Sequence, residues 1–481
     1  MRSLRFLVPV FVLIGALLAT PAEAGWGGGG GGGGGGCANS GCTTPFAVAL
    51  PIPPVLTPTS TDATTDYYTI TEEQADASII PGHTTPVWTY NGLYPGPTIK
   101  ATSGRTVKVH VTNNLPENTV MHLHGTHSPA SSDGSPGPAN ELPPGTSYDY
   151  TYPNQQSART EWYHDHAMDL TGAHVYKGLA GFYLITDDQE QSFNLPSGSN
   201  DIPVVLQDRT FNADGTLNYS LDRSSYRKGF MSDTQLVNGA PQPYLRVATR
   251  KVRLRVLNGS NARYYELRLS NGQSMTEIGN EGGLFSAPLQ MSSITLAPAE
   301  RADFIIDFSE VPVGTSVTLQ NGRWDSIGDL IRFDVATAET DTSTIPSTLR
   351  PFTPIPPSQS TVSRTFRISQ DNGVWVFNGL GFDPNRIDAH VALNATETWT
   401  FDNRSGQDHP IHVHLVNFQV LSIDGSPPPP DQAQWKETVN VPSWSTVRVI
   451  AKFTDFAGTY VFHCHILEHE DVALMGQFNV S

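Results

Sequence analysis

Short segments in which apolar and polar residues alternate recur along the chain from about residue 66 to its end. A strand turns successive side chains to opposite faces, so a period of two indicates strands with one buried face. Residues that favour turns separate the segments. Many short strands of this kind predict an all-β protein built of sandwiches. The alternation is clearest over residues 106–111, 148–152, 181–185, 252–256, 302–308, 398–401, 446–451 and 458–462.

Two connections without strand character divide this pattern. Residues 187–200 are polar, and residues 343–360 are rich in Pro, Ser and Thr. The chain of 481 residues carries 43 glycines and 37 prolines but only 16% charged residues, which also favours turn-rich β structure over long helices. We therefore predict three sandwich domains of ordinary size, over residues 66–187, 201–342 and 361–481.

The first 24 residues have the features of an export signal. Arg2 and Arg5 precede an apolar run, and Ala22-Glu23-Ala24 matches a small-x-small cleavage site. The apolar run is too short to cross a membrane, so we expect a secreted or periplasmic protein without a membrane span. Residues 25–65 are rich in Gly, Pro and Thr, and we interpret them as a flexible lead-in that buries no core.

The three cysteines fall into two groups. Cys37 and Cys42 lie close together after the glycine run and are able to form a small disulfide in an oxidising compartment. Cys464 is the odd one. A lone exported thiol is a liability unless something occupies it, which favours a ligand role for Cys464.

Histidine spacing is the strongest chemical signal in the chain. Of 15 histidines, eight form four His-x-His pairs, and alternate residues of a strand share a face. Four such strands that meet at an interface would bring eight imidazoles to one metal cluster. Ordinary surface or core histidines explain one isolated pair better than they explain four. The pairs are His122 and His124, His164 and His166, His412 and His414, and His463 and His465.

Cys464 lies between two of these histidines and points to the opposite side of the same strand. His409 and His469 are close to it in sequence, and a thiolate with two imidazoles is the donor set of a blue-copper centre. Zinc is the competing metal, but structural zinc sites usually contain more cysteines. The remaining histidines, His83, His110, His127, His174 and His390, are interpreted as ordinary.

These motifs resemble the four copper motifs of the three-domain multicopper oxidases. All four motifs are complete and occur in the family's order. The sequence that flanks them is most similar to the bacterial spore-coat laccase and bilirubin oxidase branch. The resemblance implies three consecutive cupredoxin-like Greek-key β-sandwich domains. The motifs are His122-Leu-His124-Gly, Trp162-Tyr-His164-Asp-His166, His409-Pro-Ile-His412-Val-His414 and His463-Cys464-His465-Ile-Leu-Glu-His469.

By position, the resemblance also implies the ligands of four copper ions. The type 1 ion takes His409, Cys464 and His469; the type 2 ion takes His122 and His412; one type 3 ion takes His124, His164 and His465; and the other takes His166, His414 and His463. The implied reaction oxidises a reducing substrate in one-electron steps at type 1 copper and reduces dioxygen to water at the trinuclear cluster.

Three further positions follow from the same comparison. Asp133 and Glu470 match acidic residues that relay protons in this branch, although either is equally consistent with a solvated turn residue. The axial position of type 1 copper falls on Leu474, and a local bulge would bring Met475 there instead. A non-coordinating leucine removes a weak sulfur donor, which favours Cu(I) and raises the reduction potential.

The expected substrates are phenols or aromatic amines, with dioxygen as acceptor. A net charge of −17 argues against nucleic acid as a partner, and we expect a monomer. The alternatives are a bilirubin oxidase or an iron or copper oxidase of the same superfamily; the seven methionines form no cluster, which disfavours copper oxidation. A copper-free, non-enzymatic relative would not need the complete ligand set. The proline-rich loop over residues 426–434 is either a rim of the type 1 site or a rigid connector.

Overall fold

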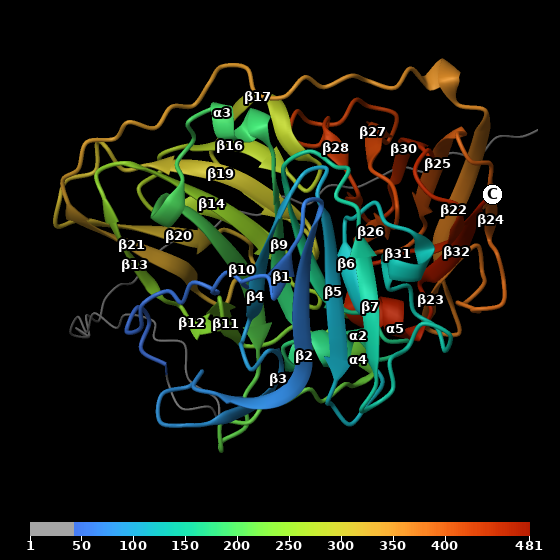
Figure 1. Ribbon diagram of the computed structural model, residues 1–481, viewed down its shortest axis with the longest axis horizontal. Coiled ribbons are helices and arrows are strands. Elements are labelled where there is room, and N and C mark those ends of the chain that lie inside the picture. The colour runs from blue at the N-terminus through green and yellow to red at the C-terminus, as the bar shows by residue number, and fades with distance from the viewer. Residues whose placement is uncertain (1–42) are drawn as a thin grey trace, which may run out of the picture. The chain divides into compact units, whose positions relative to one another are not determined.

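Six β-sheets form three consecutive sandwiches in the computed structural model, which describes residues 43–481 (Figure 1). All eight segments predicted as strands from their alternation are strands, so the all-β prediction is confirmed. Within residues 43–481, no helix has both the length and the apolar character needed to cross a bilayer. The predicted export signal, the glycine run, Cys37 and Cys42 lie outside the described residues.

The first sandwich packs two antiparallel-rich sheets around a core of Tyr, Val, Leu and Ile side chains. One sheet has the order β1-β2-β5-β7, with β3 paired to β2, and the other has the order β4-β9-β8-β6. The elements are β1 (Ser60–Thr61), β2 (Thr65–Ala77), β3 (Thr85–Tyr90), β4 (Gly96–Thr102), β5 (Thr106–Asn113), β6 (Met121–His124), α1 (Ala130–Asp133), β7 (Ser147–Tyr152), β8 (Arg159–Asp165), α2 (Thr171–Lys177) and β9 (Ala180–Thr186).

The middle sandwich has sheet orders β12-β11-β10-β14-β19-β16-β17 and β13-β21-β20-β15-β18. Two short helices, α3 (Asp188–Ser192) and η1 (Gly198–Asn200), connect it to the first sandwich. Its elements are β10 (Asp201–Arg209), α4 (Arg223–Lys228), β11 (Thr234–Val237), β12 (Ala240–Pro241), β13 (Tyr244–Ala248), β14 (Lys251–Asn258), β15 (Tyr265–Leu269), β16 (Met275–Asn280), β17 (Gly283–Met291), β18 (Ile294–Leu296), β19 (Arg301–Asp307), β20 (Ser316–Asn321) and β21 (Asp329–Thr337).

The third sandwich has sheet orders β23-β22-β25-β30-β27-β28 and β24-β32-β31-β26-β29. Its aromatic-rich core includes Cys464, so the metal-competent thiol lies inside the packed interior. The elements are η2 (Pro357–Gln359), β22 (Val362–Asp371), β23 (Val374–Phe377), β24 (Ala389–Val391), β25 (Thr396–Asn403), β26 (His409–Val413), β27 (Phe418–Ile423), β28 (Trp435–Lys436), β29 (Thr438–Val441), β30 (Thr446–Lys452), β31 (Gly458–Cys464), α5 (Leu467–Val472) and β32 (Met475–Val480).

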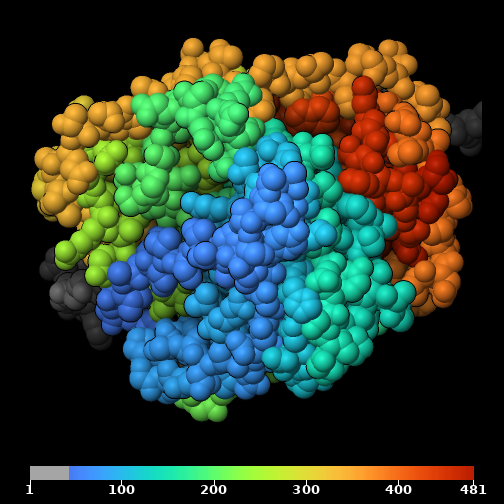
Figure 2. Space-filling view, viewed as in Figure 1, coloured from blue at the N-terminus to red at the C-terminus, as the bar shows by residue number. Residues whose placement is uncertain are grey.

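The described part of the predicted flexible lead-in is instead bound to two sandwiches. The N–H of Phe46 donates to Gln242 O (2.7 Å), the N–H of Leu50 donates to Tyr244 O (2.7 Å), and Leu56 N–H donates to the first sandwich at Thr98. Leu50 is 6% exposed and belongs to the core of the middle sandwich. Figure 2 shows this blue segment lying against the green residues of the middle sandwich. The sequence did not reveal that this Pro-rich segment is bound, because a single buried apolar side chain gives no periodic pattern.

We predict that Leu50 stabilises the middle sandwich. Leu50→Ala removes buried methyl groups and leaves a cavity, which costs about 2–3 kcal/mol of unfolding free energy. Urea-induced unfolding measures the effect. Ile52→Ala is the matched control, since Ile52 is 48% exposed and its truncation removes little buried apolar surface. Equal stability of the Leu50→Ala and Ile52→Ala proteins would contradict a bound lead-in.

Candidate metal centre

The four His-x-His pairs lie at the ends of four strands, two in each of two sandwiches. In the first sandwich β6 pairs with β8 and places His122 opposite His164. In the third sandwich β26 pairs with β31 and places His412 opposite His463. All eight imidazoles are buried, with exposures of 0–1%. The alternating strand pattern therefore delivers each pair to one face, and the two faces meet between the first and third sandwiches.

The imidazole nitrogens converge in three groups, and in each group the ligand atoms lie within 4.8 Å of one another. Each group combines residues of the first and third sandwiches. His463 Nε2 lies 3.3 Å from His166 Nε2 and 3.2 Å from His414 Nε2. The groups are His122, His124 and His412; His124, His164 and His465; and His166, His414 and His463.

Unsatisfied nitrogens show that these residues fit metal ions. Leaving a buried nitrogen without a hydrogen bond is costly. Burial lowers the pKa of seven of these imidazoles, to about 4 for His164, so these seven are neutral and have the lone pair that a metal requires. Within the described chain, the buried imidazole nitrogens that lack a hydrogen-bond partner are His122 Nε2, His124 Nδ1, His164 Nε2, His412 Nε2 and both nitrogens of His465.

The opposite ring nitrogens are held by backbone carbonyls, which fixes how each ring is turned. The Nδ1 of His122 lies 2.5 Å from Asp133 O, and the Nδ1 of His412 lies 3.0 Å from Glu437 O. His164 Nδ1 lies 2.8 Å from Asp165 O. In these three rings Nε2, the unpartnered nitrogen, therefore faces the shared space.

Asp133 and Glu470 both lie directly behind the imidazoles. Asp133 Oδ2 accepts from His414 Nδ1 at 2.9 Å, and Glu470 contacts both His166 Nδ1 (3.1 Å) and His463 Nδ1 (2.9 Å). Exposures of 1% and 2% exclude the reading of either as a solvated turn residue. Burial raises the pKa of Asp133, and the neighbouring His122 opposes that rise.

A tight turn brings Asp133 to this position. Gly134 ends α1 with a φ of 73°, and a Cβ there would lie 2.3 Å from the Met121 carbonyl oxygen. Glycine is therefore required for α1 to close against β6.

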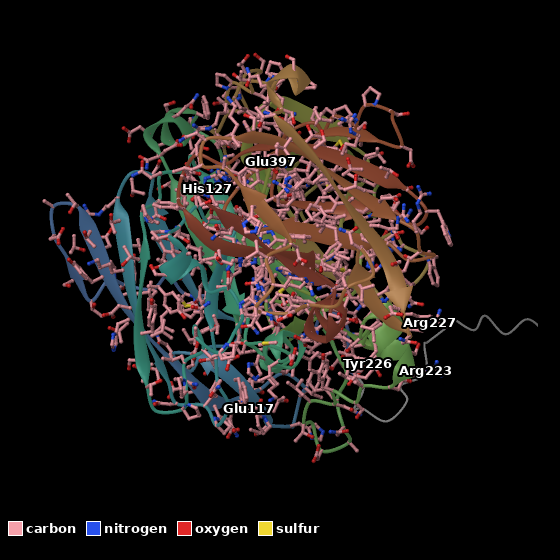
Figure 3. The ribbon with its side chains drawn as sticks, turned by 90° about the vertical axis from the view of Figure 1, so that its right-hand side faces the viewer. Glu117, His127, Arg223, Tyr226, Arg227 and Glu397 are labelled. Atoms are coloured by element: carbon pink, nitrogen blue, oxygen red, sulfur yellow. The ribbon has the colours of Figure 1, made fainter. Side chains whose placement is uncertain are left out.

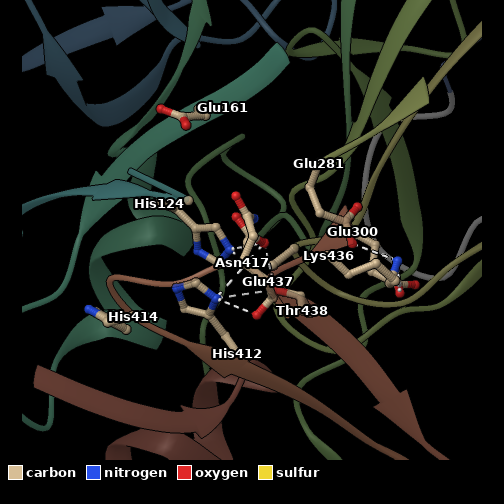
Figure 4. Close-up of polar contacts among 12 residues, drawn as sticks. His124, Glu161, Glu281, Glu300, His412, His414, Asn417, Lys436, Glu437 and Thr438 are labelled. Carbon is tan, nitrogen blue, oxygen red and sulfur yellow. Dashed lines mark hydrogen bonds and ion pairs between the residues drawn. The ribbon is translucent and has the colours of Figure 1, made fainter. Parts of the chain in front are cut away.

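Glu437 is a site residue that sequence reasoning missed. Its Oε1 lies 3.1 Å from His124 Nε2, and the Arg301 guanidinium donates to both carboxylate oxygens at 3.0 and 2.6 Å (Figure 4). Arg301 belongs to β19 of the middle sandwich, the part of the chain that contains no histidine. The middle sandwich therefore contacts the metal centre through the ion pair between Arg301 and Glu437. Neither residue belongs to a recognisable metal motif, so no local signal marked them.

His174 was interpreted as ordinary but supports the same centre. Its Nδ1 donates to Asp165 Oδ1 at 2.7 Å, and Asp165 lies between His164 and His166 in the sequence. The other Asp165 oxygen accepts from Val120 N–H at 2.8 Å. These contacts hold the segment that carries two of the imidazoles.

Cys464 forms a separate cluster with His409 and His469. The thiol sulfur lies 3.5 Å from His409 Nδ1 and 3.6 Å from His469 Nδ1. Burial lowers the pKa of His469 to about 3 and raises the pKa of the Cys464 thiol. A thiol in such a place becomes a thiolate only beside a cation, and two neutral imidazoles with a thiolate suit copper.

The surface nearest to this cluster is α4. His469 Nε2 donates to the Arg227 carbonyl at 3.1 Å, and Trp375 Nε1 donates to the same oxygen at 3.0 Å. Figure 3 shows Arg223, Tyr226 and Arg227 at the outer edge of the molecule. The loop over residues 426–434 precedes β28, at the sheet edge opposite β23, which carries Trp375. That loop therefore does not rim the Cys464 cluster, and α4 does.

Strand register decides which residue faces Cys464. β31 and β32 pair His463 with Met475, so these two side chains lie on one face. Leu474 is the next residue along, its carbonyl accepts from Cys464 N–H at 3.0 Å, and it belongs to the same apolar cluster as Cys464. The described register contains no bulge between β31 and β32.

Comparisons with known proteins agree with this geometry. Multicopper oxidase family models match residues 71–190, 158–322 and 353–481. A laccase of Bacillus stratosphericus is 36% identical over 90% of this chain and 99% of its own length. The cell division protein FtsP of Escherichia coli is 33% identical over 90% of this chain and 92% of its own.

The fold agrees as well. A crystal structure of laccase from Pediococcus acidilactici superposes with a TM-score of 0.85 and 34% identity, and the match covers 92% of this chain and 96% of that one. The three sandwiches are therefore cupredoxin-like, as expected. Taken with the family models over most of residues 71–481, this likeness shows that the chain belongs to the multicopper oxidase family of copper-dependent oxidoreductases that use oxygen.

Proposed function

We propose that this protein is a laccase-like oxidase that removes single electrons from phenols or aromatic amines and passes them to dioxygen. The observation that carries the proposal is the segment His463-Cys464-His465. Its cysteine lies in one metal-competent cluster, and its two histidines lie in two groups of the other. Membership of the family does not by itself establish the activity, because one relative is named as a cell division protein.

The donor groups support four copper ions. We assign type 1 copper to His409, Cys464 and His469, and type 2 copper to His122 and His412. We assign one type 3 ion to His124, His164 and His465, and the other to His166, His414 and His463. Copper bound by these residues would supply one-electron oxidation of the donor and four-electron reduction of dioxygen to water.

The chain's own residues supply a path for electrons between the two clusters. A donor that rests on α4 is separated from the His469 imidazole by one peptide group, that of Arg227. The peptide backbone then joins Cys464 directly to His463 and His465. Burial of all these groups excludes water, so charge transfer requires little rearrangement of solvent.

Asp133 and Glu470 are proposed to hold the protons that oxygen reduction consumes. Asp133 Oδ2 also accepts from Ser135, and its Oδ1 has no partner within the described chain, so it is free to take a proton. Glu470 contacts His166 and His463, one from each of the two sandwiches. Each carboxylate is thus placed to keep an imidazole oriented and to pass a proton beside it.

Leu474 is proposed as the axial residue. Its carbonyl accepts from Cys464 N–H at 3.0 Å and its side chain belongs to the same apolar cluster as Cys464, whereas Met475 lies in register with His463. A buried hydrocarbon in that place offers no sulfur ligand, which favours Cu(I) and a high reduction potential.

Copper content, the visible spectrum and oxygen uptake test the proposed function. Fully loaded protein is expected to bind four copper ions per chain, to be blue, and to consume oxygen with a phenol faster than with bilirubin or Fe(II). Cys464→Ser is expected to lose the blue colour and the phenol-driven uptake. A colourless wild-type protein, or one that saturates below four ions, would exclude the proposal, and faster uptake with Fe(II) would favour a metal oxidase.

Replacement of Leu474 by Met tests the axial position. A thioether beside type 1 copper stabilises Cu(II), so Leu474→Met is expected to lower its reduction potential and to slow oxidation of phenols that are difficult to oxidise. Redox titration of the blue band measures the potential. Met475→Leu is the matched control and should leave it unchanged. A rise of the potential in Met475→Leu, with no fall in Leu474→Met, would instead favour Met475 at the axial position.

Asp133→Asn tests the proposed proton donor. The amide keeps the shape but cannot deliver a proton, so kcat is expected to fall at least about tenfold while copper content is retained. Anaerobic reduction of the blue band by a phenol should remain normal, and its reoxidation by oxygen should slow. Asp149→Asn makes the same change at an exposed site, where the side chain is 75% exposed. Unchanged reoxidation in Asp133→Asn would remove Asp133 from proton delivery.

A further inference from the structure

A cavity of about 350 Å³ lies where the three sandwiches meet, away from α4. It is lined by residues of the first sandwich (His127, Arg159), the middle sandwich (Leu284) and the third sandwich (Asn417, Trp435). In Figure 3 His127 lies well away from Arg223 and Arg227. The cavity is therefore separate from the surface at which electrons enter.

Cationic side chains outnumber acids around this cavity. Arg159, Arg350 and Lys452 line it against one carboxylate, Asp455. The Asp455 carboxylate is occupied, since its Oδ2 lies 2.7 Å from His127 Nδ1. Arg350 is paired with Asp187 at 2.5 Å, which leaves Arg159 and Lys452 without an ion-pair partner among the described residues. A local excess of positive charge is unexpected in a chain whose net charge is −17.

Arg159 is the central feature. It is 8% exposed, and its guanidinium donates only to neutral acceptors: Asn417 Oδ1 at 2.6 Å, Ser157 O at 3.0 Å and Ser157 Oγ at 3.3 Å. Among the described residues, no carboxylate forms an ion pair with it. A buried guanidinium normally has such a partner, and an incoming anion would supply it.

The acids behind Arg159 do not serve as its partners. Burial raises the pKa of Glu161 to about 8, so this carboxyl is largely neutral near pH 7, and it accepts from Gln156 rather than from Arg159. Glu437 is held by both guanidinium nitrogens of Arg301. The positive charge of Arg159 is therefore available to the cavity.

The rest of the lining suits an organic group rather than an inorganic ion. Trp435 and Phe352 form an aromatic wall with ring centroids 6.0 Å apart, and Leu284 and Pro351 add apolar surface. Cavities of this size with apolar walls and a few polar groups are typical of small-molecule sites.

We propose that this cavity binds a small aromatic carboxylate, with the carboxylate at Arg159 and the ring against Trp435 and Phe352. The ligand would lie beside segments of the metal centre, since Asn417 follows His414 by three residues and Trp435 precedes Glu437 by two. The proposal does not depend on which donor the enzyme oxidises.

Binding of 4-bromobenzoate to the copper-loaded protein tests the proposal, with 4-bromobenzyl alcohol as the neutral analogue. Calorimetry is expected to show one site per chain with a Kd of about 1 mM or tighter, weakening as salt is added. The alcohol should bind at least tenfold more weakly. In crystals soaked with 4-bromobenzoate, the anomalous bromine peak should lie within the cavity, beside the wall formed by Trp435 and Phe352.

The variant Asn417→Asp tests whether 4-bromobenzoate binds in this cavity or elsewhere on the protein. The new carboxylate would pair with Arg159 and occupy its charge, so 4-bromobenzoate affinity should fall at least tenfold. Asn271→Asp makes the same change at an exposed turn and should bind as the wild type does. Lys452→Gln, at an exposed position, should weaken binding about threefold and remains informative if Asn417→Asp does not fold.

Three results would overturn the proposal. These are no binding of 4-bromobenzoate at about 10 mM, equal affinity for the acid and the alcohol, or a bromine peak elsewhere with unchanged affinity in both Asn417→Asp and Lys452→Gln.

Discussion

The alternation of side chains along β31 is the constraint on which the rest of this structure depends. Consecutive residues of a strand point to opposite faces, so Cys464 turns into the third sandwich while His463 and His465 turn towards the first. The peptide units on either side of Cys464 therefore connect two metal-competent clusters through few covalent bonds. The other contacts at the metal centre bring six further imidazoles towards His463 and His465.

Buried polar groups enforce that convergence at a cost in stability. Eight imidazoles, two carboxylates and the Arg301–Glu437 ion pair lie in an interior where each unsatisfied group is unfavourable. Backbone carbonyls of Asp133, Glu437 and Asp165 satisfy one nitrogen of three of the rings, and the other nitrogen of those rings has no partner within the described chain. Such a centre is stable only when cations complete it, so copper binding and stability are coupled.

The middle sandwich shows how a domain without histidines contributes. Arg301 fixes Glu437 against His124, and the Arg227 carbonyl accepts from His469. Both contacts join residues more than 130 positions apart, and no spacing rule links them. The cavity around Arg159 has the same origin, because each sandwich supplies only part of its lining.

The strands, the all-β class and the set of metal-competent residues were predictable from the sequence, because alternation and His-x-His spacing are local and a strand converts them directly into faces. How those faces are used depends on tertiary packing. The tertiary structure showed that Leu50 belongs to a core, that Asp133 and Glu470 are buried behind imidazoles, and that Glu437, Arg301 and His174 hold the site. It also paired Met475 with His463 and brought the Leu474 carbonyl to Cys464 N–H. These outcomes depend on packing between segments far apart in the chain, for which a single sequence carries no periodic signal.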